Sequence, residues 1–205
     1  MVGFNRRFAP LLAKMKELLA PVREPVAFVY TCNAGPVPPD HWTRDEGIGG
    51  GRIAGEACHF IDLLRHLAGA RIVETQVMPL GDARGAALYD DSALISLRFE
   101  NGSVGTIQYL ANGGTRFPKE RLEAFGGGGV LRLDNFRVLR GYGWRGFSRA
   151  MLWRQDKGQR ACAAAFLASI RDGASSPIPI DEIWEVARTT IEIAARHRSA
   201  RVSQA

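Results

Sequence analysis

The sequence predicts an α+β fold in which an open, mostly antiparallel β-sheet has helices packed on one face. From Arg71 onward, apolar and polar residues alternate with a period of two, which is typical of half-buried strands. The linkers between these runs are short, and short linkers favour antiparallel neighbours because parallel neighbours need long crossovers. Helical patterns come before and after the strands, so we expect the helices to form one layer over the sheet.

The N-terminal part predicts a strand end, a helix, a strand and a long loop. Residues 2–5 have the pattern of a strand end, and residues 7–19 predict a helix that is broken by Pro21. Residues 25–33 are rich in β-formers and predict a strand. Residues 35–51 form a loop with three prolines, and a loop of this length inside a domain usually has a function or covers a site.

The next element is a helix over residues 52–68, with Gly69 as its C-cap. At about 100° per residue, one face of this helix is apolar. His59 and Asp62 lie along the other side, and Glu56 lies at the boundary. The helix therefore presents a histidine between two carboxylates directly after a glycine-containing loop.

Strands and two helices are expected in the rest of the chain. Asn101-Gly102 lies between two alternating runs and is a strong hairpin signal. The candidate strands span residues 72–78, 93–100, 104–110, 121–125, 130–134, 136–139 and 151–153. Helices are expected over residues 158–171 and 181–197, followed by a flexible tail over residues 199–205.

Composition narrows the class of protein. The 205 residues contain no apolar run long enough for a membrane span, so we expect no membrane partner. The cysteines Cys32, Cys58 and Cys162 have no paired spacing, which favours a reducing, cytoplasmic location over a disulfide framework or a zinc site. The net charge of +6 could suggest nucleic acid, but the arginines are dispersed and form no basic block. We expect no nucleic-acid partner, and a phosphate-bearing substrate is a better use of the charge.

A loose dinucleotide fingerprint is present at Gly49, Gly51 and Ala54, with Glu74 about twenty residues further on. The fingerprint requires a hydrophobic strand immediately before the glycines, whereas residues 40–46 are polar. We therefore interpret the segment as a flexible loop that leads into a helix. The N-terminus of that helix still favours anions.

His59 is the sharpest candidate for chemistry. It lies one turn from Glu56 and one from Asp62, so a carboxylate could orient its ring and set its pKa. The alternative is a histidine on a partly polar helix face, and the residues alone leave both open. Together with His66, these side chains could also suggest metal ligands. One helix rarely supplies three converging ligands, so no metal is expected.

Residues 49–62 resemble the Gfo/Idh/MocA family of glucose–fructose oxidoreductase and inositol dehydrogenase. The shared pattern is a glycine loop, apolar residues, an acid, three spacers, a histidine, two spacers and an aspartate. Residues 2–10 are similar to the end of the family's Rossmann domain, residues 100–105 to its sheet hairpin, and residues 156–173 to its C-terminal helix. The segment at residues 52–56 is similar to members associated with polysaccharide or nucleotide-sugar pathways.

The resemblance implies a fold like the C-terminal domains of dihydrodipicolinate reductase and glyceraldehyde-3-phosphate dehydrogenase. It implies an NAD- or NADP-dependent parent enzyme that acts on a sugar or nucleotide sugar. Residues 1–24 would be the remnant of a Rossmann domain, and residues 25–198 the substrate-binding and oligomerisation domain. This chain alone would bind no cofactor, be inactive, and form a homodimer or tetramer through its sheet. The alternative is a non-catalytic interaction module that uses the sheet face.

The resemblance also assigns residues. His59 matches the family's catalytic histidine, and the family's catalytic aspartate falls on Gly55. Glu56 is the candidate substitute, although a shift of one residue on a helix rotates the side chain by about 100°. Asp62 matches the family's second acid and is grouped with the substrate-binding residues. The other candidate substrate-binding residues adjoin the glycine loop or the domain junction and are Arg7, His41, Trp42, Gly50 and Gly51.

Overall fold

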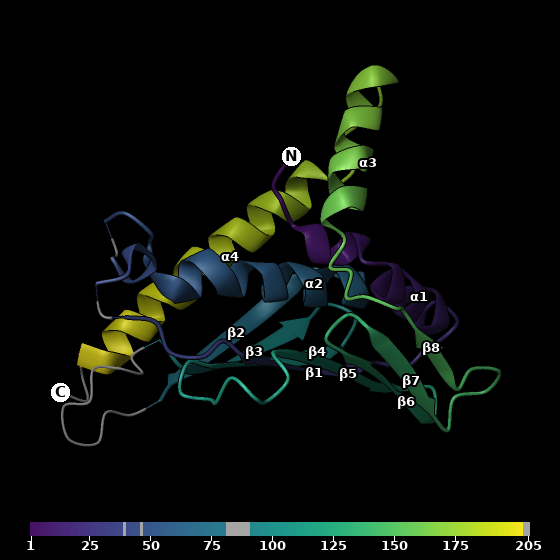
Figure 1. Ribbon diagram of the computed structural model, residues 1–205, viewed down its shortest axis with the longest axis horizontal. Coiled ribbons are helices and arrows are strands. Elements are labelled where there is room, and N and C mark those ends of the chain that lie inside the picture. The colour runs from purple at the N-terminus through teal and green to yellow at the C-terminus, as the bar shows by residue number, and fades with distance from the viewer. Residues whose placement is uncertain (39, 46, 81–90, 203–205) are drawn as a thin grey trace.

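The computed structural model describes residues 1–38, 40–45, 47–80 and 91–202. Figure 1 shows a twisted sheet with the helices above one face and the other face uncovered. The strands are β1 (Ala27–Asn33), β2 (Ile72–Pro79), β3 (Ala93–Phe99), β4 (Val104–Leu110), β5 (Glu120–Gly126), β6 (Gly129–Asp134), β7 (Val138–Tyr142) and β8 (Arg149–Met151). The helices are η1 (Asn5–Phe8), α1 (Pro10–Leu19), η2 (Trp42–Arg44), η3 (Ile53–Ala57), α2 (Cys58–Ala68), α3 (Gln159–Arg171) and α4 (Ile180–Val202). The predicted α+β architecture is confirmed.

The strand order across the sheet is β2-β3-β4-β1-β5-β6-β7-β8. Among the described strands, β1 and β4 form the one parallel pair, with Ala27 opposite Val104. The other neighbours are antiparallel, as the short linkers predicted. The parallel pair is possible because α2, β2 and β3 lie between β1 and β4 in the chain and provide the long crossover.

Alternation along each strand sends every second side chain toward the helices. In β3, Ile95, Leu97 and Phe99 are buried, while the residues between them are exposed. The Asn101-Gly102 turn joins β3 to β4 as predicted, and Gly102 has a φ of +83°, which glycine adopts readily.

Helix α2 lies on the buried face of the sheet and forms the centre of the core. Leu63 and Leu64 are fully buried, and the Phe60 ring stacks on Tyr30 with 4.6 Å between centroids. A Cβ on Gly105 of β4 would lie 2.8 Å from the Leu64 side chain, so glycine lets the helix approach the sheet closely. Each fully buried side chain of this kind contributes about 1.5–3 kcal/mol to the free energy of unfolding.

Several element boundaries differ from the prediction. Residues 1–4 lack regular structure instead of ending a strand, and the first α-helix begins at Pro10 because proline suits the first helical position. The predicted end of α2 at Gly69 is confirmed, with φ at +63°. Helix α4 continues to Val202, so the tail expected from residue 199 is wrong for residues 199–202, and residues 203–205 lie outside the described range.

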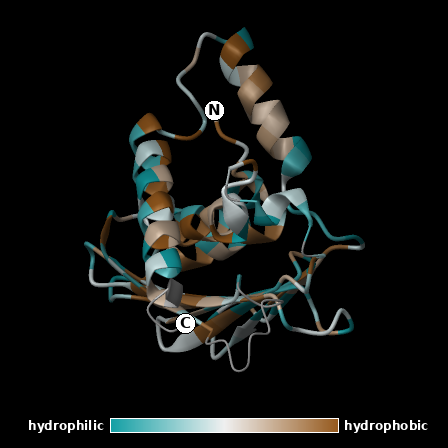
Figure 2. Ribbon diagram, turned by 90° about the vertical axis from the view of Figure 1, so that its left-hand side faces the viewer, coloured by the Kyte–Doolittle hydropathy of each residue, from teal (hydrophilic) through white to brown (hydrophobic). Residues whose placement is uncertain are grey.

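Helix α3 projects away from the rest of the helical layer (Figures 1 and 2). Its base contacts η1, and its Leu167 and Ile170 side chains are 64% and 62% exposed. Apolar colouring continues along much of its length in Figure 2. In the described part of the chain, no helix combines the length and the apolar character that crossing a membrane requires.

Candidate functional site

The helix that carries His59 begins with an unusual turn. Residues 53–57 form a π-helical turn, η3, that continues directly into α2. Gly50 and Gly51 lead into it with φ angles of +70° and +77°, values that side chains other than glycine rarely adopt. Turns of this type are rare and occur often at functional sites. His59 is the second residue after this turn, so the irregular segment sets its direction.

His59 has unused hydrogen-bonding capacity. Its ring meets Phe4 edge-on with 5.8 Å between centroids, and its Nδ1 atom is buried with no hydrogen-bond partner among the described residues. Burial and the nearby Arg6 guanidinium lower the pKa of His59 to about 4. The imidazole is therefore neutral at pH 7, with one nitrogen able to accept a proton and the other able to donate one.

A buried carboxylate, Glu120, lies at the start of β5 close to this histidine. It is 1% exposed and accepts hydrogen bonds from Arg6 Nε at 2.9 Å and Arg6 Nη2 at 3.2 Å. The Tyr30 hydroxyl and the Lys157 ammonium also donate to it. Burial opposes ionisation of Glu120, but Arg6 and Lys157 outweigh it and lower the pKa of this carboxyl to about 2. We call Arg6, Tyr30, Glu120 and Lys157 the Glu120 cluster.

The charges of the Glu120 cluster do not cancel. Arg6 and Lys157 carry two positive charges against the single negative charge of Glu120, and both cations influence His59. The backbone carbonyl of Lys157 is held by the Asn5 side-chain amide at 2.7 Å, which fixes the segment that precedes α3. An excess cation beside a neutral histidine favours a substrate with electron-rich oxygen atoms.

Asp62 belongs to a second, closed network. It is fully buried and accepts two hydrogen bonds from Arg7, one of them from Nε at 3.0 Å. Arg7 Nη1 also donates to Glu182 at 2.8 Å, and Arg65 pairs with Glu182 and Glu185. Burial raises the pKa of Asp62 to about 6, and Arg7 limits the rise. We call these five residues the Asp62 cluster.

Arg7 and Asp62 are buried and form an ion pair with each other in the structure. Both were expected to contact substrate, but the structure buries both and pairs them with each other. The physical reason is that a buried guanidinium needs a carboxylate partner, and Asp62 is the nearest one on α2. In this structure they join η1, α2 and α4, and their contact with substrate stays a prediction.

Glu56 also differs from its expected role. Its Oε1 atom accepts a hydrogen bond from Arg52 Nε at 3.2 Å, and Arg52 Nη1 donates to the Gly35 carbonyl at 2.9 Å. Arg52 is 2% exposed and lies over the Tyr109 ring, so it needs this counter-charge. Within the described residues, no carboxylate has a hydrogen bond to the His59 ring, although the charge of Glu56 raises the pKa of His59. Orientation of the ring by Glu56 or Asp62 stays a prediction. Catalysis by Glu56 stays a prediction.

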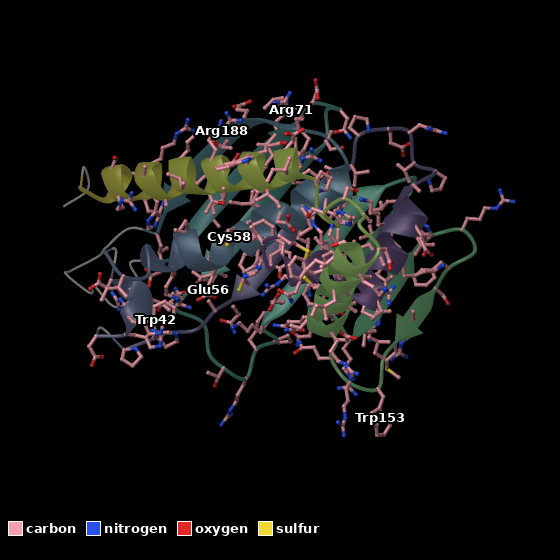
Figure 3. The ribbon with its side chains drawn as sticks, turned by 90° about the horizontal axis from the view of Figure 1, so that it is seen from above. Trp42, Glu56, Cys58, Arg71, Trp153 and Arg188 are labelled. Atoms are coloured by element: carbon pink, nitrogen blue, oxygen red, sulfur yellow. The ribbon has the colours of Figure 1, made fainter. Side chains whose placement is uncertain are left out.

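His41, Trp42 and Gly49 belong to the segment that leads into η3, the helical turn before His59. His41 caps η2 through its Nδ1 atom, which accepts from the Thr43 amide at 3.3 Å. Trp42 is 61% exposed, and Figure 3 shows it at the same end of the molecule as Glu56. Gly49 lets the loop close on η2, since a Cβ there would lie 2.6 Å from the Trp42 carbonyl. No described contact joins His41 or Trp42 to His59, so their contact with substrate stays a prediction.

The Glu120 cluster could not be found by motif reasoning, because its members come from distant parts of the sequence. One signal was present. Glu120 precedes Arg121 and occupies the same alternating set as the buried Leu122 and Ala124, so it is a charged residue at a position that faces the helices. The predicted strand began at residue 121 and therefore did not include Glu120. Within the described ranges, no three His, Cys, Asp or Glu side chains are grouped in a way that could hold a metal ion.

Comparison with known proteins adds an independent observation. Residues 24–132, more than half of the chain, match the family model described as the GFO/IDH/MocA C-terminal domain. A curated relative, an uncharacterized oxidoreductase YrbE of Bacillus subtilis, is 30% identical over 148 residues, covering 66% of this chain and 40% of the relative. Myo-inositol 2-dehydrogenase of Thermotoga maritima is 28% identical over 146 residues, covering 66% of this chain and 41% of that protein.

A solved structure extends the likeness of fold to nearly the whole chain. The levoglucosan dehydrogenase complex with NADH superposes with a TM-score of 0.74 at 21% identity, covering 96% of this chain and 64% of that one. This chain therefore spans about two fifths of the length of the curated relatives that it matches.

Proposed function

Because this chain belongs to the Gfo/Idh/MocA family and contains its C-terminal domain, we propose that it is the substrate-binding part of an NAD- or NADP-dependent dehydrogenase of sugars or nucleotide sugars. The observation that carries the proposal is His59, a neutral imidazole with a buried and unpartnered Nδ1 atom beside an excess positive charge. The names of the inositol and levoglucosan dehydrogenases support a polyol or sugar as substrate.

In this proposal His59 moves a proton. Oxidation of an alcohol requires a base for the hydroxyl proton, and a neutral histidine whose ring is already positioned can accept it. Arg6 and Lys157 lower the affinity of His59 for a proton, so a protonated His59 would return its proton readily. Glu120 holds both cations in place and keeps them from repelling each other. The other substrate oxygens would face the exposed parts of Lys157 and the loop at Trp42.

The described residues do not fit a dinucleotide. The glycines at 49–51 follow η2 instead of a buried strand, and they lead through the π-helical turn η3 into α2. We therefore propose that another domain holds the cofactor and that this chain alone neither binds NAD or NADP nor turns over substrate.

The N-terminal segment and α3 offer a surface for such a domain. Met1 and Val2 are 42% and 41% exposed, and together with Cys162 and Phe166 they line a mostly apolar cavity of about 320 Å³. Helix α3 is otherwise uncovered along much of its length. We propose that residues 1–24 adjoin a Rossmann domain that packs against α3.

Two titrations of the purified chain test this proposal. Calorimetry with NAD⁺ and NADH is expected to show no binding, and tight binding would contradict the assignment of the cofactor to another domain. NMR of the His59 ring during titration with myo-inositol and glucose is expected to show millimolar binding that is lost in His59→Gln. An unchanged His59 signal with every polyol would contradict the substrate site.

A second proposal, which does not require catalysis, is that the uncovered sheet face assembles two copies of the chain. Leu94, Val104, Phe125 and Tyr142 alternate with core-facing residues and are exposed. Light scattering is expected to show a dimer that becomes a monomer in Phe125→Lys. A monomer for the unchanged chain at micromolar concentration would contradict this proposal.

A further inference from the structure

A cavity lies away from His59, where the end of α2, the start of β2 and the first turns of α4 meet. Its volume is about 590 Å³, and its walls are Arg65, Arg71, Asp181, Trp184, Glu185 and Arg188. It shares no residue with the Glu120 cluster, and Figure 3 shows Arg71 and Arg188 beside each other at one edge of the molecule. The volume suits a small metabolite.

The inner wall of this cavity is already paired. Arg65 Nε lies 3.3 Å from Glu185 Oε2, and Arg65 Nη1 lies 3.7 Å from Glu182. Glu185 also accepts a hydrogen bond from the Ile72 amide, so it ties α4 to β2. These contacts make the inner wall rigid and leave it without surplus charge.

The mouth of the cavity, by contrast, carries free positive charge. Arg71 and Arg188 are exposed, and within the described residues neither guanidinium has a hydrogen bond or an ion pair. Asp181 supplies one carboxylate at this end of α4, so two guanidinium groups face one negative charge. A guanidinium presents paired N–H groups that match two oxygens of a phosphate. The N-terminal end of α4 adds to the positive potential.

Trp184 supplies a flat apolar wall next to these arginines. Its side chain lies on α4 between Asp181 and Arg188 and is 69% exposed. Its ring is well suited to stack on a sugar or a base. We propose that this cavity binds a phosphorylated small molecule, with the phosphate between Arg71 and Arg188 and the ring of the ligand on Trp184. The proposal is independent of His59 and of the reaction proposed above.

Calorimetry at low salt tests the proposal with three probes: inorganic phosphate, glucose 6-phosphate and AMP. We expect the double variant Arg71→Gln/Arg188→Gln to lose at least tenfold in affinity for every probe that binds. The matched control Arg145→Gln/Arg154→Gln removes the same charge elsewhere and should change affinity less than twofold. Trp184→Ala should weaken glucose 6-phosphate or AMP and leave inorganic phosphate unchanged. The sugar phosphate and the nucleotide are distinguished by which of the two binds more tightly.

Four results would overturn the proposal. The first is that no probe binds. The second is an equal loss in the control double variant, which would show an unspecific effect of charge. The third is binding of inorganic phosphate alone, unchanged in Trp184→Ala, which would remove the ring-bearing ligand. The fourth is a dimer that dissociates in Arg71→Gln/Arg188→Gln while phosphate binding is absent, which would assign this face to a second copy. All three variants change exposed residues, and an unchanged melting temperature confirms that they fold.

Discussion

Arg6 and Arg7 are neighbours in the sequence, but each belongs to a different buried charge cluster. Arg7 points to Asp62 in a cluster where three carboxylates surround two arginines, and the cluster joins η1, α2 and α4. Arg6 points to Glu120, where two cations share one carboxylate and the nearby His59 Nδ1 has no partner in the described chain. Both carboxylates are buried. The comparison teaches that an excess of cations beside an unpartnered histidine nitrogen, more than burial, distinguishes the candidate site from the support.

The largest expected effect is on the Asp62 cluster. Replacing Asp62 with Ala leaves the buried Arg7 with Glu182 alone, and the loss of one partner of a buried pair costs about 3–5 kcal/mol of the free energy of unfolding. Urea unfolding measures it. The control Glu17→Ala breaks the exposed Lys14–Glu17 pair and should cost less than about 1 kcal/mol. Equal losses for the two substitutions would contradict the structural role of the buried Arg7–Asp62 pair.

A smaller loss is expected for Glu120→Gln. Glutamine keeps an acceptor oxygen but removes the charge that Arg6 and Lys157 share, so we expect a loss of about 2–3 kcal/mol. The pKa of His59 should also fall further, because Glu120 raises it. NMR titration measures this shift, and Asp134→Asn on the uncovered face should leave it unchanged. A rise in the pKa of His59 would contradict the influence of the Glu120 charge on His59.

Acid should weaken the fold in a defined range. The unfolded chain binds protons at its histidines near pH 6.5, whereas folded His59 and His66 have pKa values lowered to about 4 and about 3, mainly by burial. Asp62, raised to about 6, binds a proton in the folded state and offsets one histidine. The net excess of one proton in the unfolded state lowers the free energy of unfolding by about 1.4 kcal/mol per pH unit as the pH falls from 6 to 5. Below about pH 5 the loss becomes steeper, because the pKa of Glu120 is lowered to about 2 in the folded state and the unfolded chain binds a proton there first.

Urea midpoints at pH 7, 6, 5 and 4 measure this slope. The variant His59→Gln removes one of the two histidines, so its profile should become nearly flat between pH 6 and 5 and fall only below about pH 5, where Glu120 contributes. A stability that rises toward pH 4 in the unchanged chain would contradict the lowered pKa values.

The smallest effect is expected for the loss of His59 itself at pH 7. Its Nδ1 atom makes no hydrogen bond among the described residues, so His59→Gln should cost less than about 1 kcal/mol. The ring of His66 contacts Lys16 Nζ at 3.2 Å, so His66→Gln should cost about 1 kcal/mol more. Differential scanning calorimetry compares the two variants, and a larger loss for His59→Gln would show that it is a structural residue.

Much of the fold could be predicted because it depends on local patterns. The alternation in β3, the turn at Asn101 and Gly102, and the helix end at Gly69 are each encoded within a few residues. The parallel pairing of β1 with β4 could not be predicted, because no local pattern indicates which distant strand is a neighbour. The π-helical turn likewise leaves no signal in apolar spacing.

The site could be predicted only in part for the same reason. His59 was identified from its motif, but Arg6, Glu120 and Lys157 come from three separate parts of the chain. The spacing on one helix also suggested the wrong partner for Glu56. Helical spacing shows which side chains are close to each other, but it does not show which of them Glu56 will pair with, here the buried Arg52.

The position of β1 has a consequence for how the chain is made. Both of its neighbours come much later in the sequence, since Ala27 lies opposite Val104 in β4 and Phe125 in β5. During synthesis β1 leaves the ribosome with neither edge paired. Its Phe28 and Tyr30 side chains stay without their sheet neighbours until β4 and β5 have been translated. The strand at the centre of the finished sheet is thus the one that a nascent chain must shield longest from aggregation.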